Sequence, residues 1–241
     1  MFVNILGFNL YSGTADQIPY NNDKKILINT MNPRVFTISR RNELLKIAFE
    51  NTEYLVEDGQ YFALAPLLLR GRFVRKVSGT DVFYAMMSKA NINKGKVFFL
   101  GASEDTLEMM KHRCSLDYQN IQIEYFSPPY KDCFSDEENE GILKRINNFS
   151  PDILFIGMTA PKQEIWAYHN KEKLNARIIC SVGAVFEWYA GVKKVPGKIW
   201  VKLGLEWLIR TIRRPEILKR YPDYLMFFWL LFLNIVRIRR D

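Results

Sequence analysis

Short apolar runs alternate with longer amphipathic stretches along most of this chain. Several runs are apolar at consecutive positions, which is typical of strands buried on both faces of a parallel sheet. They occupy residues 25–29, 53–57, 96–100, 121–125, 153–156 and 177–182. The intervening stretches place apolar residues three and four positions apart and predict helices at 36–50, 80–91, 104–118, 136–148 and 161–173. The alternation predicts an α/β fold in which helices flank a mostly parallel, Rossmann-like sheet.

The composition is that of an ordinary globular chain with an appendage at its carboxyl end. Of the 241 residues, 48% are apolar and 25% are charged, which excludes disordered, collagen-like and disulfide-stapled chains and a protein with many membrane spans. We expect residues 1–195 to form the α/β core and residues 196–241 to form a basic and apolar C-terminal appendage.

The positive charge is concentrated near this end of the chain. The net charge is +8, and twelve basic and four acidic residues lie from Lys193 onward, so residues 1–192 are neutral overall. A basic tail on a neutral body indicates an anionic partner, which could be the phosphates of a ligand, a lipid surface or a nucleic acid. No nucleic-acid partner is expected, because the aromatic residues gather in the apolar end instead of interleaving with basic residues.

The apolar end of the appendage is a candidate membrane-binding helix. Residues 225–236 read LMFFWLLFLNIV and are followed by arginines. A helix of this length spans roughly 18 Å, which is short of the ~30 Å of a hydrocarbon core. Aromatic and apolar residues flanked by arginines suit a helix that lies in a membrane interface and meets anionic headgroups. The alternative is a terminal helix docked in an apolar groove of this protein or of a second subunit.

The amino terminus and the cysteines indicate a cytoplasmic protein. Residues 1–7 are apolar except for Asn4 and have no basic leader, so we expect no signal peptide and a peripheral location on the inner face of the cell membrane. Cys114, Cys133 and Cys180 form no CxxC pair, and the chain has two histidines. We therefore expect reduced thiols, with neither a metal site nor a cofactor.

Polar residues follow several predicted strands, at the edge where parallel α/β sheets bind their ligands. Asp58 follows the second strand, and Thr30 and Asn32 follow the first. A carboxylate at this edge, near hydroxyl and amide side chains, is placed as a general base would be. Asp58 also precedes a glycine, and that pair alone is a common turn. Gly101 and Gly183 mark two further strand ends.

The loop after residues 153–156 is the most informative. It begins at Gly157 and continues through Pro161 to Lys162, Gln163 and Glu164. Glycine permits a ligand to approach the backbone, and proline suits the first turn of a helix, whose amino terminus can bind a phosphate or a sugar hydroxyl. The segment matches neither a P-loop nor a GxGxxG fingerprint, so a proline-started helix with solvated charges is the alternative.

Charged residues later in the chain complete the candidate site. Glu187 follows a glycine-containing turn and could hydrogen-bond a ribose hydroxyl or only favour a helix dipole. Arg210, Arg213, Arg214 and Arg220 are dense enough to bind a diphosphate. No Asp-x-Asp pair lies near a strand end, so we expect these arginines, instead of a metal ion, to neutralise a leaving diphosphate.

Motifs in a fixed order extend over roughly residues 25–221. They are Thr30-x-Asn32, Asp58-Gly59, Arg75-x-x-x-Gly79-x-Asp81, Leu100-Gly101-Ala102, Pro151-Asp152-Ile153-Leu154, Gly157, Pro161-Lys162-Gln163-Glu164, Val182-Gly183, Phe186, Ala190-Gly191, Pro196, Gly204-Leu205-Glu206-Trp207-x-x-Arg210, Pro215 and Arg220-Tyr221. In this order they resemble the WecG/TagA/CpsF glycosyltransferases, glycosyltransferase family 26. PKQE followed by GLEWxxR is hard to obtain by chance.

The resemblance implies an activity and its partners. It implies inverting, metal-independent transfer of a sugar, of the N-acetylmannosamine type or a related hexose, from a UDP-sugar donor. The implied acceptor is linked to a polyprenyl diphosphate at the inner membrane surface, in the synthesis of a surface polysaccharide. A homo-oligomer is possible by the same analogy. The appendage would close over the active site.

The resemblance also implies roles for individual residues. Asp58 would be the general base, Thr30 and Asn32 would position the acceptor or donor sugar, and Gln163 would contact the sugar near its anomeric carbon. Glu187 would contact the uridine.

Arg210 and Arg220 would stabilise the charge that develops on the UDP diphosphate. Two positions depart from the family pattern. Glu187 stands where the family usually has Asp, and Ile217 stands where it often has an arginine that Arg213 or Arg214 could replace.

Another class of function remains open from the residues. The sheet edge could bind a nucleotide and the tail could serve as a partner helix in an interaction module without chemistry. Stable oligomers without turnover of any UDP-sugar would favour that hypothesis.

Overall fold

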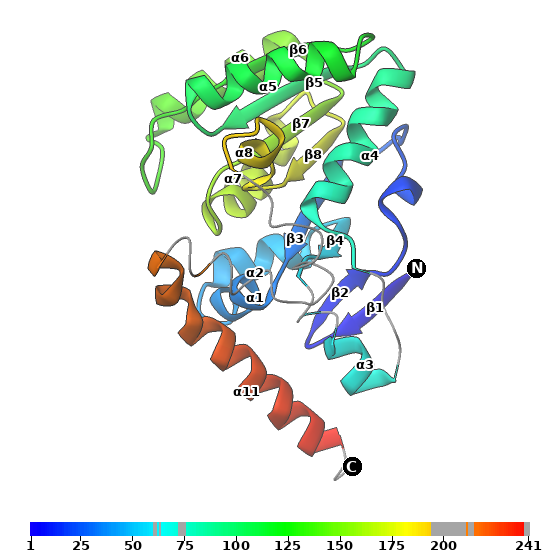
Figure 1. Ribbon diagram of the computed structural model, residues 1–241, viewed down its shortest axis with the longest axis vertical. Coiled ribbons are helices and arrows are strands. Elements are labelled where there is room, and N and C mark those ends of the chain that lie inside the picture. The colour runs from blue at the N-terminus through cyan, green and yellow to red at the C-terminus, as the bar shows by residue number, and fades with distance from the viewer. Residues whose placement is uncertain (60–61, 63, 72–75, 194–210, 212–214, 239–241) are drawn as a thin grey trace.

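Helices surround a single sheet in the computed structural model, which describes residues 1–241 apart from 60–61, 63, 72–75, 194–210, 212–214 and 239–241. The sheet has eight strands in the order β1-β2-β4-β3-β8-β7-β5-β6 (Figure 1). All neighbouring strands are parallel except β1 and β2. The strands are β1 (Phe2–Ile5), β2 (Phe8–Tyr11), β3 (Ile26–Met31), β4 (Tyr54–Glu57), β5 (Lys96–Gly101), β6 (Gln122–Phe126), β7 (Ile153–Gly157) and β8 (Ile178–Ser181). The predicted α/β fold with a mostly parallel sheet is confirmed.

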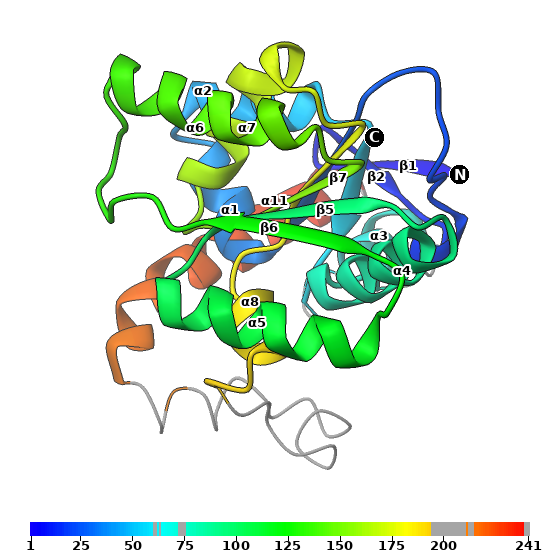
Figure 2. The same cartoon turned by 90° about the horizontal axis from the view of Figure 1, so that it is seen from above.

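Helices cover both faces of the sheet, as Figure 2 shows for α2, α6 and α7 on one side and α4, α5 and α8 on the other. The α-helices are α1 (Pro33–Ser39), α2 (Glu43–Glu50), α3 (Leu64–Arg70), α4 (Gly79–Ile92), α5 (Glu104–Asp117), α6 (Asp136–Phe149), α7 (Lys162–Asn170), α8 (Val185–Tyr189) and α11 (Tyr221–Ile238). Short 3-10 turns are η1 (Ala15–Gln17), η2 (Lys171–Lys173) and η3 (Pro215–Arg220).

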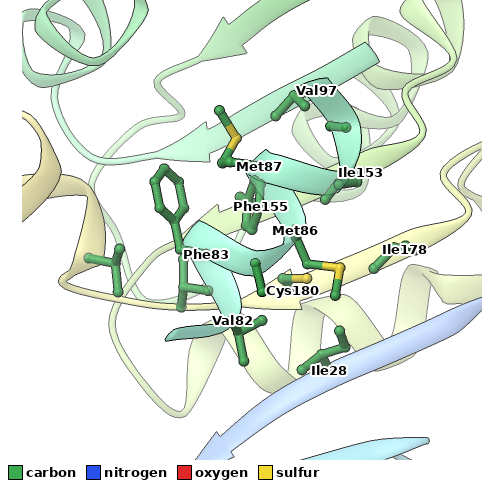
Figure 3. Close-up of a cluster of buried hydrophobic side chains, with 14 of the residues drawn as sticks. Ile28, Val82, Phe83, Met86, Met87, Val97, Ile153, Phe155, Ile178 and Cys180 are labelled. Carbon is green, nitrogen blue, oxygen red and sulfur yellow. The ribbon is translucent and has the colours of Figure 1, made fainter. Parts of the chain in front are cut away.

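Helix α4 forms the centre of the core on one face. Phe83, Met86 and Met87 project from it onto β3, β5, β7 and β8 and are fully buried (Figure 3). The ring centroids of Phe83 and of Phe155 on β7 lie 4.9 Å apart, with the two rings tilted by 50°. Close packing of these large side chains holds the strands at the positions from which the loops at their carboxyl ends project.

A second apolar cluster joins α11 to the other face. Phe227 of α11 is fully buried, with its ring centroid 5.2 Å from that of Phe62 and 5.6 Å from that of Phe36 on α1. The same cluster contains residues of β1, β2 and β4. The last helix of the chain is thus packed against the segment that directly follows β3.

The structure contains a helix that was not predicted, α3, and departs from the predicted elements in two further places. The helix predicted at 36–50 is divided into α1 and α2, because Asn42 accepts a hydrogen bond from the backbone N–H of Leu45 and starts a new helix. Residues 2–11 form a hairpin that was not predicted. Its turn residues Leu6 and Gly7 have φ values of 53° and 94°. A leucine at the first of these positions does not predict such a turn.

Candidate active site

The carboxyl ends of β3 and β4 bring the first predicted site residues together. The two strands are paired in parallel with Thr30 opposite Val56, and the backbone N–H of Asp58 donates to the carbonyl of Met31 at 2.8 Å. Thr30 is 8% exposed at this edge. Asn32 follows β3 directly, and its Oδ1 accepts a hydrogen bond from the N–H of Val35 at 3.0 Å as the cap of α1. The Nδ2 group and the second lone pair of Oδ1 are the parts of this side chain that a ligand could contact.

A chain of hydrogen bonds joins the end of β8 to the first turn of α7. The N–H of Gly183 donates to Oε1 of Gln163 at 3.1 Å, and Nε2 of Gln163 donates to Oε1 of Glu164 at 2.8 Å. Both side chains are buried. Gly183 has a φ of +57°, a left-handed conformation that glycine adopts readily. Pro161, which follows a cis peptide bond, occupies the N-cap position of α7, and the helix begins at Lys162. The turn fixes the Gln163 amide at the carboxyl edge of the sheet.

Glu164 is a buried carboxyl that titrates near neutral pH. Burial raises its pKa to about 7, while the hydrogen bond from Gln163 and the positive charge of Arg34 act in the opposite direction. Its Oε2 atom has no hydrogen-bond partner among the described residues. Such a group can donate a hydrogen bond when protonated and accept one when ionised.

Arg34, which the sequence interpretation did not single out, links this carboxyl to α11. It lies in the first turn of α1, and its Nε atom is buried without an acceptor among the described residues. Burial and the neighbouring charge of Arg220 lower its pKa, whereas Asp223 and Glu164 raise it. Nε lies 3.7 Å from Oδ2 of Asp223. The only signal in the sequence was that an arginine follows Asn32-Pro33 directly after a strand.

Glu57, the last residue of β4, is a second buried carboxyl that was not predicted from the sequence as a site residue. It is 0% exposed, and neither carboxylate oxygen has a partner among the described residues. Burial raises its pKa to about 7, Lys76 lowers it and the adjacent Asp58 raises it. A glutamate that closes an otherwise apolar strand was the available signal. Because Glu57 and Asp58 interact electrostatically, the ionisation of one influences the other.

Buried polar atoms without partners gather at this edge of the sheet. In the part of the chain that the structure describes, they include atoms of Arg34, Glu57, Glu164 and Ser181, the last residue of β8. Buried polar groups in proteins are nearly always hydrogen-bonded, so each exception calls for an explanation. Water molecules or a ligand that reaches this edge could supply the missing partners.

Close packing explains why two of the predicted site residues are glycines. Gly101 and Gly157 lie opposite each other in the pairing of β5 and β7. A Cβ atom on Gly157 would lie 2.3 Å from the ring of Phe186, and one on Gly101 would lie 2.7 Å from the carbonyl oxygen of Gly157. Any larger residue at either position would force the neighbouring strand or helix α8 to move.

Lys162 and Glu187 are engaged in contacts away from Gln163 and Glu164. Nζ of Lys162 donates to the carbonyl of Lys131 at 2.6 Å and lies 3.5 Å from the ring centroid of Phe134, in the loop between β6 and α6. Glu187 on α8 forms an ion pair with Lys193.

The predicted phosphate-binding arginines are placed only in part. Arg210, Arg213 and Arg214 lie outside the described residues. Arg220 is the exposed last residue of η3 and is close enough to Arg34 to lower the pKa of that guanidinium. One of the four predicted arginines is thus located beside the carboxyl edge of the sheet.

Other features of the described surface lie apart from this site. A hollow of about 610 Å³ is lined by residues 50–53, 168–169 and 171–172, and another of about 300 Å³ lies between the β1–β2 turn, α1, α3 and α11. No described helix has the length and apolar character needed to cross a membrane. Within the same residues, no cluster of three His, Cys, Asp or Glu side chains could hold a metal ion.

Comparison with known proteins matches the chain to one family along nearly its whole length. The sequence model of the glycosyl transferase WecG/TagA/CpsF family matches residues 3–241. A protein of Staphylococcus aureus strain NCTC 8325 / PS 47, named N-acetylglucosaminyldiphosphoundecaprenol N-acetyl-beta-D-mannosaminyltransferase, is 27% identical over 234 residues. The match covers 92% of this chain and 90% of the relative. A protein of the same name from strain MRSA252 is equally similar.

Proposed function

Because the chain belongs to the WecG/TagA/CpsF family and is a glycosyltransferase, we propose that it transfers a sugar to an acceptor linked to a polyprenyl diphosphate. The Staphylococcus aureus relatives are named for transfer of N-acetylmannosamine to an N-acetylglucosaminyl-diphosphoundecaprenol. A sugar of this type, or a related hexose, is the proposed cargo, and a UDP-sugar is the proposed donor. The product would enter the synthesis of a surface polysaccharide.

The observation that carries the proposal is the cluster of buried polar side chains at one sheet edge in a chain that matches the family along nearly its whole length. Parallel α/β sheets bind ligands at this edge. The proposal is favoured over a nucleotide-binding module without chemistry, because the family is one of enzymes.

In the proposed reaction Asp58 acts as the general base. Its carboxylate takes the proton of an acceptor hydroxyl as that oxygen attacks the anomeric carbon, and the bond between that carbon and the UDP oxygen breaks. Attack from the face opposite UDP inverts the anomeric centre. Thr30 and Asn32 orient the reacting sugars, and Gln163, held by Gly183, contacts the donor near the anomeric carbon.

The leaving UDP carries its negative charge into a basic region. We assign stabilisation of that charge to Arg220 and Arg210, with Arg213 or Arg214 as a further contributor, and propose that no metal ion is needed. Glu187 is assigned to the uridine. The appendage that contains these arginines would close the site.

The exposed face of α11 supports peripheral binding to a membrane. Trp229 is 56% and Phe232 54% exposed, and Leu225, Phe228 and Leu233 are exposed beside them. We call these five residues the apolar patch of α11. Aromatic side chains on a helix with basic neighbours favour an interfacial position at an anionic bilayer. Such a position would bring the enzyme to a lipid-linked acceptor.

The experiment that tests the proposal is transfer of labelled sugar from a panel of UDP-sugars to a polyprenyl-diphosphate-linked N-acetylglucosamine in the presence of EDTA. We expect turnover by the wild type and a loss of roughly 10²–10⁴-fold in Asp58→Asn, the usual contribution of a general base. Asp23→Asn is the matched control, because Asp23 is exposed and precedes β3 at the other edge of the sheet. Equal rates for Asp58→Asn and the wild type would refute the role of Asp58.

A further inference from the structure

Two arginines of α1 and its end converge on one carboxylate of α11. Nε of Arg34 lies 3.7 Å from Oδ2 of Asp223, and Nη1 of Arg41 lies 3.8 Å from Oδ1. Thr37, between them on the same face of α1, donates its hydroxyl to the carbonyl oxygen of Asp223 at 2.8 Å. The segment from 34 to 41 is thereby fixed against the start of α11. We call Arg34, Arg41 and Asp223 the junction cluster.

The junction cluster has more positive charge than its own carboxylate can balance. Both arginine–carboxylate distances exceed the 2.7–3.2 Å of a hydrogen bond. Arg220 adds a third guanidinium close enough to lower the pKa of Arg34. The Nε donor of Arg34 is buried and has no acceptor among the described residues. Guanidinium groups in this situation are suited to phosphate oxygens, which accept two parallel hydrogen bonds.

The position of the cluster along α11 indicates where its ligand comes from. Asp223 lies two residues before Leu225, the first residue of the apolar patch of α11. If the patch lies in the bilayer interface, the junction cluster lies beside the headgroups. The side chain of Arg41 is 63% exposed and that of Arg34 is 24% exposed, so both are partly accessible to a ligand although Nε of Arg34 is buried.

We propose that Arg34 and Arg41 bind the diphosphate of the lipid-linked acceptor at the membrane surface. This inference rests on the proposed function for the identity of the acceptor, and it goes beyond it by giving the acceptor a diphosphate site separate from that of UDP. The polyprenyl chain extends along the apolar patch, and the acceptor sugar extends toward the carboxyl edge of the sheet. Arg34 spans the two regions, since it interacts with both Asp223 and Glu164.

The test measures binding of a short prenyl diphosphate to the full-length protein, so that it does not depend on turnover. The probes are farnesyl diphosphate, farnesyl monophosphate and farnesol in detergent. Their affinities are compared by equilibrium competition. We expect the wild type to prefer the diphosphate. Arg34→Gln and Arg41→Gln should each weaken its binding by roughly tenfold or more, the worth of a charged hydrogen-bonded contact. Binding of farnesol should be unchanged in both.

Control variants separate this effect from net charge and from folding. Arg40→Gln removes the same charge from an exposed neighbouring residue and should leave diphosphate binding unchanged. Arg40 lines the hollow of about 300 Å³ between the β1–β2 turn, α1, α3 and α11. Arg34→Lys keeps the charge and should recover part of the affinity. Asp223→Asn removes the competing carboxylate but keeps the backbone bond to Thr37, and should strengthen diphosphate binding.

Three results would overturn the proposal. The first is failure of the wild type to prefer farnesyl diphosphate over farnesol. The second is weaker UDP binding in Arg34→Gln and Arg41→Gln with farnesyl diphosphate binding unchanged, which would assign the cluster to the donor. The third is weaker binding to phosphatidylglycerol vesicles, again with farnesyl diphosphate unchanged, which would make it a phospholipid contact. Absence of sugar transfer with intact diphosphate binding would count against the proposed function alone.

Discussion

The buried carboxyl of Glu57 should make the stability of this protein depend on pH in a specific direction. Its pKa rises from 4.5 to about 7 on folding because the side chain is removed from water without a hydrogen-bond partner among the described residues. The folded state therefore holds the proton more tightly than the unfolded state. Between pH 4.5 and 7 the unfolded chain has released this proton while the folded protein still holds it. The free energy of unfolding therefore decreases as the pH rises from 4.5 to 7, and Glu57 lowers it no further above pH 7.

The magnitude follows from the size of the shift. One pKa unit corresponds to 1.36 kcal/mol, so Glu57 should cost roughly 3 kcal/mol of folding free energy at pH 8 and nothing at pH 4. Glu57→Gln removes the titrating group while keeping its shape. The difference in free energy of unfolding between Glu57→Gln and the wild type should therefore increase by about that amount from pH 4.5 to pH 8.

The assay is urea unfolding of both proteins at half-unit pH steps, followed by circular dichroism. Glu124→Gln is the matched control, because Glu124 is an exposed glutamate on the edge strand β6. Its difference from the wild type should stay flat over the same range. The difference is the informative quantity, since it cancels the titration of groups that do not interact with Glu57 and leaves that of Glu57 with its coupling to Asp58.

A flat difference for Glu57→Gln would refute the reasoning. It would mean that Glu57 gains a partner or water in the folded protein and titrates as it does in the unfolded chain. A difference that falls with rising pH would show an even larger error, because it would require Glu57 to be stabilised in its charged form.

Two further predictions concern the membrane face and the packing between strands. Replacing Trp229 and Phe232 by Ser should reduce flotation with anionic liposomes while leaving UDP affinity intact, whereas Met109→Ser, which removes an apolar residue of α5 that is 47% exposed, should have no effect. Gly157→Ala should lower the urea midpoint by an amount equivalent to about 1–3 kcal/mol or more, because its Cβ would overlap the buried ring of Phe186, and an unchanged midpoint would contradict that packing.

Local sequence patterns were sufficient for the core architecture. The six runs predicted as strands all form strands, and β3, β5, β7 and β8 are buried at nearly every position, as is typical of the central strands of a parallel sheet. Parallel strands end at a common edge, so the gathering of Thr30, Asn32, Asp58 and Gln163 followed from the alternation of strands and helices. The motif order was enough to identify the family.

The tertiary structure alone decided which charged groups meet and how deeply they are buried. Arg34 and Asp223 are 189 positions apart, and no periodicity connects them; they meet because α11 packs Phe227 against Phe36. In the sequence Glu57 is an ordinary polar residue at a strand end, and only the folded chain around it excludes water from it. Periodicity reports how a residue is oriented on its own element, whereas the pKa of a carboxyl and the partner of a guanidinium depend on what other elements place around them.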